Sequence, residues 1–266
     1  MGARDKAEAP ELEDDFNESD LEESELESYW TMSTSPLQVL VFLLPFVIFY
    51  EVGSLVWADE LGATSLEARR ILSTLFEIFG VVGVHLPAVA LITVLLSWQM
   101  IERKAWRIDV RGLGLMAIES VVWALPLVVL AAMTGLLGGG GGEGGIGSLS
   151  VGSRATIAVG AGVYEELVFR FALIAVVHTV LVDFSGMRQK LGDWFAVGFS
   201  ALVFAAYHRA EVGGEIVVAA LVFYMASGVY LGSLFLGRGL GIAAGAHAIY
   251  DLIVLVALPA MDRGPG

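Results

Sequence analysis

The stretch ATIAVGAGVYEELVFRFALIAVVHTVLV, residues 155–182, decides how this chain is organised. It is long and apolar enough to cross a bilayer, which takes about 20 apolar residues, yet it carries Glu165, Glu166 and Arg170 near its middle. A charged side chain at a bilayer centre costs roughly 2.5–3.5 kcal/mol, so three facing lipid would cost about 9 kcal/mol. We therefore expect these charges to face protein or enclosed water, and an ionisable cluster in that setting predicts a functional site.

The remaining sequence has the composition of an integral membrane protein. Hydrophobic residues make up 56% of the 266 positions, in long blocks separated by short polar stretches. We expect an all-α, multi-pass protein of the cell membrane, a bundle of about seven transmembrane helices with eight as the alternative. The second helix is long enough to bend at Pro87, and the fifth is short enough to end inside the membrane. The expected spans are residues 37–57, 71–98, 112–137, 155–182, 194–207, 216–236 and 240–258.

The N-terminal segment differs from the rest of the chain. Its first 30 residues hold twelve acidic and two basic side chains, a net charge of −10. A segment so charged and so poor in apolar residues cannot bury enough surface to offset the entropy of ordering the chain. We predict a disordered acidic tail over residues 1–36, followed by a single transmembrane helical domain over residues 37–260.

Charge and cysteine content exclude several functions. Outside the tail the net charge is −4, the difference between −14 for the chain and −10 for the tail, so no basic face is available to bind nucleic acid. Cysteine is absent, which excludes thiol catalysis, disulfides and thiolate metal sites. Loop cations favour an intracellular N-terminus by seven to five. The seven inner cations are Arg103, Lys104, Arg107, Arg111, Arg188, Lys190 and Arg238, and the five outer ones are Arg69, Arg70, Arg154, Arg209 and Arg263.

Several other features are expected to be structural. The glycine run at 138–147 predicts a flexible connector, because no Gly-Lys-Ser/Thr sequence of a phosphate loop follows it. The pairs Gly228 with Gly232 and Gly241 with Gly245 predict close helix packing. Isolated polar side chains on apolar helices are expected to be hydrogen-bonded core residues, and these are His85, His178, Glu51, Glu77 and Glu119.

The charged cluster divides by helix geometry. Successive residues on a helix are about 100° apart, so Glu165 and Glu166 cannot share one face, whereas Glu166 and Arg170 are one turn apart. We predict an ion pair between Glu166 and Arg170. Glu165 then needs partners from other helices, and the candidates are His208 together with His247 and Asp251, which are again one turn apart. The three polar stripes are expected to meet.

These residues carry a resemblance to a known family. Glu165 to Arg170 match the pattern EExxxR, Phe204 to His208 match FxxxH, and His247 to Asp251 match Hxxx(N/D), in that order. The ordered set resembles the CPBP family of intramembrane proteases, which contains CAAX-processing endopeptidases and bacteriocin-processing or immunity proteins of the Abi type. The resemblance covers residues 155–258 and implies hydrolysis of a membrane-associated peptide, lipid-modified in part of the family.

The resemblance also implies roles. Glu165 would activate water with the help of His208, His247 and residue 251 would face the oxyanion, and Glu166, Arg170 and Phe204 would support them. Here position 251 is Asp251 in place of asparagine, and an ionised aspartate cannot donate a hydrogen bond to an oxyanion. Either Asp251 is protonated or, as we favour, it accepts a hydrogen bond from His247, which is then the donor.

Three alternatives remain open from the sequence. Glu165, His208 and His247 have the composition of a zinc site with two histidines and one carboxylate, although a glutamate-activated water without a cofactor is favoured. Buried glutamate and histidine also occur in proton-coupled transporters. A non-catalytic scaffold or immunity protein would keep the fold without cleaving a peptide.

Overall fold

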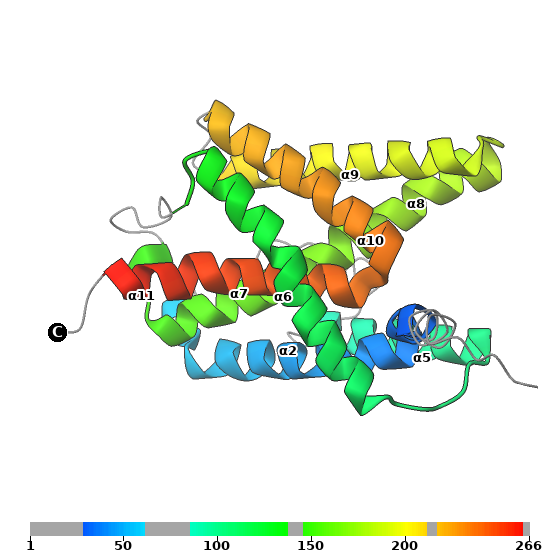
Figure 1. The fold of residues 1–266 in the computed structure, drawn as a ribbon, viewed down its shortest axis with the longest axis horizontal. Coiled ribbons are helices and arrows are strands. Elements are labelled where there is room, and N and C mark those ends of the chain that lie inside the picture. Colours follow the sequence, from blue (N-terminus) through cyan, green and yellow to red (C-terminus); the bar gives the residue numbers. More distant parts are fainter. Residues whose placement is uncertain (1–28, 62–85, 138–145, 212–216, 263–266) are drawn as a thin grey trace, which may run out of the picture.

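The protein is helical throughout the part that the structure describes. The computed structural model describes residues 29–61, 86–137, 146–211 and 217–262, and no strand occurs among them (Figure 1). The longer helices are α2 (Pro36–Val56), α5 (Leu86–Glu102), α6 (Val110–Met133), α7 (Val151–Glu165), α9 (Gln189–Glu211) and α10 (Val218–Leu252). The short ones are α3 (Ala58–Leu61), η1 (Ile146–Ser148), η2 (Glu166–Ile174), α8 (Ala175–His178), η3 (Thr179–Phe184), η4 (Ile253–Ala257) and α11 (Leu258–Asp262).

Four helical stretches among the described residues are long and apolar enough to cross a membrane. They are Pro36–Val56, Val110–Met133, Val151–Phe184 and Val218–Met261, and Ala88–Glu102 is a shorter apolar helix. These stretches confirm an all-helical membrane protein, but they do not confirm the expected count of seven or eight. The second expected span, residues 71–98, begins outside the described residues, and His85 and Glu77 also lie outside them. Helix α5 is described only from Leu86, so the bend at Pro87 stays a prediction.

The expected helices at 216–236 and 240–258 are joined directly, without a connecting loop. Helix α10 runs through both and continues into η4 and α11, with a sharp bend at Gly239, where φ is 78° and ψ is 178°. Only glycine adopts this backbone conformation without strain. Figure 1 shows the two halves of α10 leaving the bend in different directions.

The predicted boundary of the N-terminal tail is too late in the sequence. Residues 29–33 form a helix, and Ser33 is fully buried. The Tyr29 hydroxyl donates a 2.5 Å hydrogen bond to Glu119 of α6, so burial and this contact raise the pKa of Tyr29 above its ordinary value. Packing of aromatic side chains against a buried polar pair orders this short segment, which the acidic composition of residues 1–36 did not indicate. Residues 1–28 lie outside the described part of the chain.

Helix α10 lies at the centre of the packing, in contact with α6, α7 and α9. Its glycines allow close approach, as the sequence predicted. A Cβ added at Gly228 would lie 2.9 Å from the Cα of Ala201 in α9, and one added at Gly245 would lie 2.4 Å from Ser120 Oγ in α6. A third close approach is at Gly162 of α7, where an added Cβ would lie 2.5 Å from the backbone nitrogen of Ala248.

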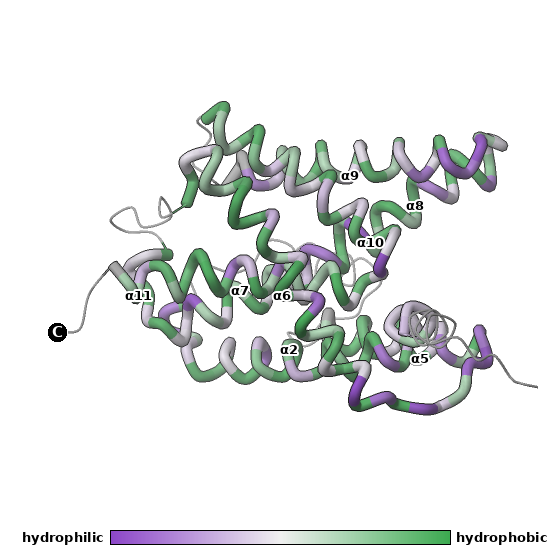
Figure 2. The backbone as a smooth tube through the Cα atoms, in the orientation of Figure 1, coloured by the Kyte–Doolittle hydropathy of each residue, from purple (hydrophilic) through white to green (hydrophobic). Residues whose placement is uncertain are grey.

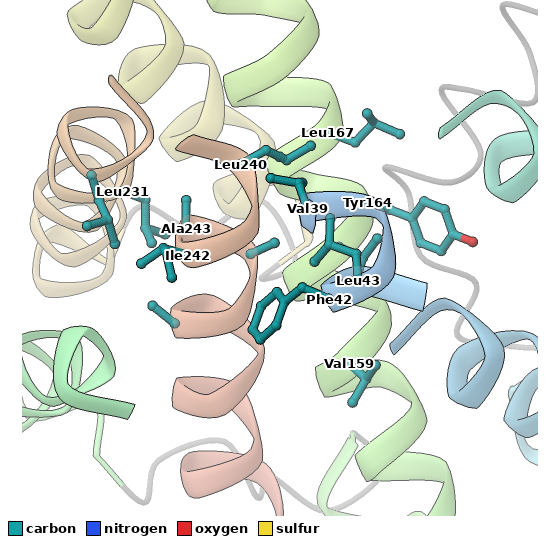
Figure 3. Close-up of a cluster of buried hydrophobic side chains, with 14 of the residues drawn as sticks. Val39, Phe42, Leu43, Val159, Tyr164, Leu167, Leu231, Leu240, Ile242 and Ala243 are labelled. Atoms are coloured by element: carbon teal, nitrogen blue, oxygen red, sulfur yellow. The ribbon is translucent and has the colours of Figure 1, made fainter. Parts of the chain in front are cut away.

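The apolar core joins α2, α7 and α10. Figure 3 shows Val39 of α2 beside Leu240 of α10, with Ile242 on the other side of α10 near Leu231. Phe42 of α2 and Val159 of α7 belong to the same cluster. Many large apolar side chains are exposed, and Figure 2 shows the helices as largely hydrophobic along their lengths, with hydrophilic residues gathered near several helix ends and in the connection between α5 and α6. This distribution fits helices that lie in lipid.

Candidate active site

The helix that carries the charged cluster is fixed at its start. Ser150 caps α7 by accepting a hydrogen bond from the Ser153 backbone nitrogen. Glu60 of α3 accepts hydrogen bonds from the Ser153 hydroxyl at 2.5 Å and from the Ser150 backbone nitrogen at 2.9 Å. These donors hold the pKa of Glu60 below its ordinary value. The contacts set the position of α7 at the end far from the site.

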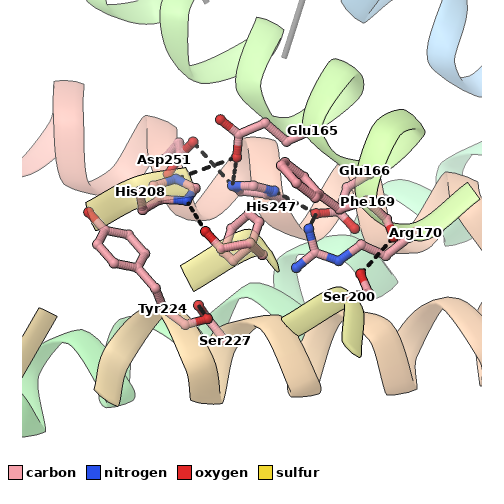
Figure 4. A network of polar contacts seen from close by, with 11 residues as sticks. Glu165, Glu166, Phe169, Arg170, Ser200, His208, Tyr224, Ser227, His247 and Asp251 are labelled. Atoms are coloured by element: carbon pink, nitrogen blue, oxygen red, sulfur yellow. Dashed lines mark hydrogen bonds and ion pairs between the residues drawn. The ribbon is translucent and has the colours of Figure 1, made fainter. Parts of the chain in front are cut away.

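The helix changes its winding where the cluster begins. Helix α7 ends at Glu165, and the next nine residues form the π-helical segment η2. A π-helical turn is wider than an α-helical one, is rare in proteins and is found frequently at functional sites. Glu165 and Glu166 therefore lie at the junction of two windings. Both of their side chains reach towards His247 of α10 (Figure 4).

The predicted ion pair between Glu166 and Arg170 is present. Arg170 Nη1 lies 3.0 Å from Glu166 Oε1, and both side chains are fully buried. The Arg170 guanidinium also lies over the ring of Phe204 in α9, 4.2 Å from the ring centre. A buried charge pair of this kind fixes the positions of its members, because separating them would leave an uncompensated charge inside the protein.

Glu166 has a second partner that the sequence did not predict. His247 Nδ1 lies 2.8 Å from Glu166 Oε1, the same oxygen that contacts Arg170. Since a carboxylate oxygen accepts, the Nδ1–H of His247 is the donor. The sequence prediction had assigned this orienting role to Asp251, whose Oδ2 lies 3.5 Å from the other ring nitrogen, Nε2. Glu166 is thus the closer orienting acceptor of His247.

His208 is oriented by its own helix and by aromatic rings. Its Nδ1 lies 3.1 Å from the carbonyl oxygen of Phe204, and a carbonyl only accepts, so Nδ1 carries the proton. The ring stacks on Tyr224 of α10, with centroids 4.2 Å apart and planes at 25°, and it contacts Phe204 at 4.3 Å. Tyr224 was not identified from the sequence, since no spacing pattern links it to the three motifs. Nε2 of His208 then faces the centre of the cluster.

The two imidazoles converge on one carboxylate oxygen. Glu165 Oε2 lies 3.6 Å from His208 Nε2 and 3.8 Å from His247 Nε2. Glu165 and His247 are both buried, with 4% and 5% of their surfaces exposed. Figure 4 shows Glu165, His208, His247 and Asp251 grouped together, with Glu166 and Arg170 on the far side of His247. The polar stripes of three helices meet, as the sequence predicted.

The other polar residues expected to be structural do have partners where the structure describes them. The Tyr164 hydroxyl donates to Glu51 of α2 at 2.7 Å. Arg238 donates to both carboxylate oxygens of Glu119. His178 Nε2 lies 3.2 Å from Asp193 Oδ1 at a partly exposed position. None of these contacts includes the four residues proposed as catalytic.

The site can be compared with the zinc alternative. No group of three or more histidine, aspartate or glutamate side chains has the arrangement of a metal site within the described part of the chain. The nearest candidates are Glu165, His208 and His247, whose two Nε2 atoms face the same oxygen. Their Nδ1 atoms are bonded away from the centre, as the outer nitrogens of zinc-binding histidines also are. The donor types suit zinc, and the described geometry does not form a closed ligand set.

Comparison with protein families supports the resemblance drawn from the motifs. Residues 148–253, less than half of the chain, match the family model described as Type II CAAX prenyl endopeptidase Rce1-like. This segment contains all three motifs, and the match confirms the resemblance to the CPBP family of CAAX proteases. No curated protein and no solved structure shows significant similarity to the chain.

Proposed function

Because residues 148–253 resemble the Rce1-like endopeptidases, we propose that this protein is an intramembrane endopeptidase of the cell membrane that hydrolyses membrane-associated peptides. The apolar helices place the chain in the membrane, and the family implies a peptide substrate there. A prenylated peptide is the first substrate to test. The proposed catalytic residues are Glu165, His208, His247 and Asp251, with Glu166, Arg170 and Phe204 in supporting positions.

One observation carries the proposal: two imidazole nitrogens on different helices face the same oxygen of Glu165. His208 Nε2 has a lone pair, since its proton is on Nδ1, and Glu165 Oε2 is also an acceptor. Two acceptors 3.6 Å apart do not bond to each other directly, but a water molecule between them can donate one hydrogen to each. That water keeps its oxygen lone pairs free to attack a carbonyl carbon.

The reaction follows from these positions. Glu165 takes a proton from the water as its oxygen bonds to the scissile carbonyl carbon, which gives a tetrahedral oxyanion. His247 stabilises this oxyanion through an N–H at Nε2, while its Nδ1–H remains bonded to Glu166. The proton held by Glu165 then passes to the amide nitrogen as the carbon–nitrogen bond breaks. Atoms and charge balance, and the only co-reactant is water.

Among the proposed catalytic residues, Asp251 acts through His247 in this scheme. Its Oδ2 lies 3.5 Å from His247 Nε2, so together with Glu165 and Glu166 it places three carboxyl groups around one imidazole. These groups favour His247 as a donor at both nitrogens. The aspartate in place of asparagine thus supports oxyanion binding through His247 rather than by donating a hydrogen bond itself.

The direct test is cleavage of a membrane-tethered peptide, prenylated or unmodified, by purified protein, with product masses as the readout. Glu165→Gln keeps the size of the side chain and removes the base, so we expect cleavage to fall by at least about 100-fold. Asp193→Asn is the matched control, because it removes a carboxylate from the partly exposed contact with His178, outside the site. Equal cleavage by Glu165→Gln and the unchanged protein would contradict the proposal.

A chelator separates the zinc alternative from a water activated by Glu165 alone. Activity that survives metal removal contradicts the zinc mechanism. Activity that is lost and then restored by zinc alone would assign Glu165, His208 and His247 as ligands.

The same purified protein separates the remaining function classes. Proton flux across vesicles without peptide cleavage would support a transporter, whereas neither activity would support a scaffold or immunity protein.

A further inference from the structure

One cavity has none of the proposed catalytic residues in its lining. This partly open cavity of about 360 Å³ is lined by the start of α2, the C-terminal half of α5 and the bend of α10. Its volume falls within the roughly 300–1,000 Å³ typical of ligand sites. Most of its lining is apolar, and the charged residues on it are Glu102 and Lys104. The apolar lining includes Val39, Leu95, Trp98, Phe235 and Leu240.

Cations are frequent in the loop that contributes Lys104 to the lining of this cavity. The loop from α5 to α6 carries Arg103, Lys104 and Arg107, and Arg111 follows in the first turn of α6. Lys104 is paired with Glu102 at 2.7 Å, and Glu102 also accepts from Trp98 Nε1 at 2.6 Å. No ion pair within the described ranges involves the three arginines, which are all exposed.

The same loop has the composition of a membrane interface. The side chain of Trp106 is 61% exposed and that of Ile108 is 52% exposed, between the arginines. The loop connects an apolar helix to a membrane-spanning one, so it lies where α5 and α6 leave the membrane. Tryptophan and arginine together at this depth are typical of segments that contact lipid headgroups.

Two buried glutamines hold the loop against the wall of the cavity. Gln99 Nε2 donates to the carbonyl of Lys104 at 3.0 Å, and its Oε1 accepts from the Leu37 backbone nitrogen at 3.2 Å. Gln38 exchanges two hydrogen bonds with the backbone of Asp109, at 2.8 and 3.1 Å. Both glutamines are fully buried. The fold therefore fixes the position of the cationic loop relative to the apolar cavity.

Arg103 shows that the loop keeps a cation at a conformational cost. It has a φ of 53°, and among the described residues no other non-glycine residue has a positive φ. Glycine or asparagine normally occupies this position after a helix, because other side chains are strained there. An exposed arginine offers no packing gain to offset that strain, which points to a role for its charge.

We propose that the cavity and the loop together bind an anionic phospholipid, with an acyl chain in the cavity and the headgroup phosphate on Arg103, Arg107 and Arg111. The apolar lining matches a hydrocarbon chain and the exposed guanidinium groups match a phosphate. A free phosphate would leave the apolar lining unused, and an uncharged lipid would leave the cations unused. The inference does not depend on peptide cleavage.

Native mass spectrometry of the full-length protein, titrated with phosphatidylglycerol or phosphatidylcholine, tests the proposal. We expect phosphatidylglycerol to bind at least about tenfold more tightly, since each nearby cation strengthens anionic lipid binding about fivefold. The triple variant Arg103→Gln, Arg107→Gln, Arg111→Gln should abolish this preference. The double variant Arg188→Gln, Lys190→Gln is the control, because it removes cations from a different part of the fold, the residue before α9 and the first turn of α9, and should keep the preference.

A second variant tests the cavity itself. Gly237 lines the cavity, and an added Cβ there would meet no atom within 4 Å, so we expect Gly237→Leu to take up space beside the lining. We expect it to weaken binding of both lipids while thermal unfolding stays unchanged. Glycerol phosphate, which has the headgroup charge without chains, should not compete. The proposal is overturned if wild-type protein binds the two lipids equally, if the control variant loses the preference as fully as the triple variant, if Gly237→Leu binds normally, or if glycerol phosphate displaces the lipid.

Discussion

At the scale of single residues, Glu166 contacts two side chains, Arg170 and His247, through one carboxylate oxygen. Its Oε1 contacts Arg170 at 3.0 Å and accepts from His247 at 2.8 Å. Arg170 thereby fixes the carboxylate that orients the imidazole. The spacing of Glu166 from Arg170 predicted only their ion pair. The structure adds a second partner for Glu166, His247 of α10.

Glu166→Gln should damage both the fold and the reaction. Arg170 would lose its charge partner, and leaving one member of a buried pair alone costs about 3–5 kcal/mol. We expect a clearly lower unfolding temperature, and in the folded fraction a kcat lowered about 100-fold with KM little changed, because His247 loses its orientation. Thermal unfolding and cleavage kinetics measure the two effects.

Asp251→Asn is the comparison for that variant. It keeps the shape of the side chain and leaves the shorter contact between Glu166 and His247 intact. We expect the unfolding temperature and most of the activity to be retained. A larger loss of kcat from Asp251→Asn than from Glu166→Gln would show that Asp251, not Glu166, orients His247.

At the scale of elements, the bend in α10 decides where its polar residues lie. The first half carries Tyr224, which stacks on His208, and the second half carries His247 and Asp251. Without the bend at Gly239, a straight helix of 35 residues would separate these groups by about 1.5 Å for every residue between them. The bend returns the second half towards α7, where Gly162 allows the close approach of Ala248.

Gly239→Ala should therefore destabilise the protein. A side chain at a φ of 78° and ψ of 178° costs about 1–3 kcal/mol, so we expect a lower unfolding midpoint. Gly237→Ala is the matched control two residues away, because Gly237 has no positive φ and has open space for a methyl group. Equal midpoints for the two variants would contradict a strained bend at Gly239.

At the scale of the whole molecule, one polar cluster joins the helical residues 29–33 to the bundle. Arg238, next to the bend, donates to Glu119 of α6 and to Ser33 Oγ, and its guanidinium lies 3.8 Å from the ring centre of Trp30. Tyr29 donates to the same glutamate. Residues far apart in the sequence thus hold the bend of α10 against α6.

Truncation tests the importance of this connection. Removing residues 1–35 would delete Tyr29, Trp30 and Ser33, which contact Glu119 and Arg238. Glu119 and Arg238 would lose these partners, so we expect a lower unfolding temperature. Removing residues 1–28 keeps these contacts and should leave the unfolding temperature unchanged. An equal effect of the two truncations, measured in the same detergent, would contradict a structural role for the segment 29–35.

The sequence alone determined the features that depend on local spacing. The i to i+4 rule predicted the Glu166–Arg170 pair, the apolar blocks predicted helices, and the small residues predicted the close approach at Gly228 and Gly245. The three motifs predicted which side chains would meet. These features follow from helix periodicity, which is a property of the chain itself.

Only the tertiary structure decided how these side chains meet. Both Nε2 atoms face one oxygen of Glu165, His247 bonds to Glu166 in preference to Asp251, Tyr224 stacks on His208, and residues 29–33 are helical. Each of these contacts depends on the distance and rotation between separate helices, which packing at the glycine contacts and the bend at Gly239 sets. Periodicity along one helix carries no information about its position relative to another.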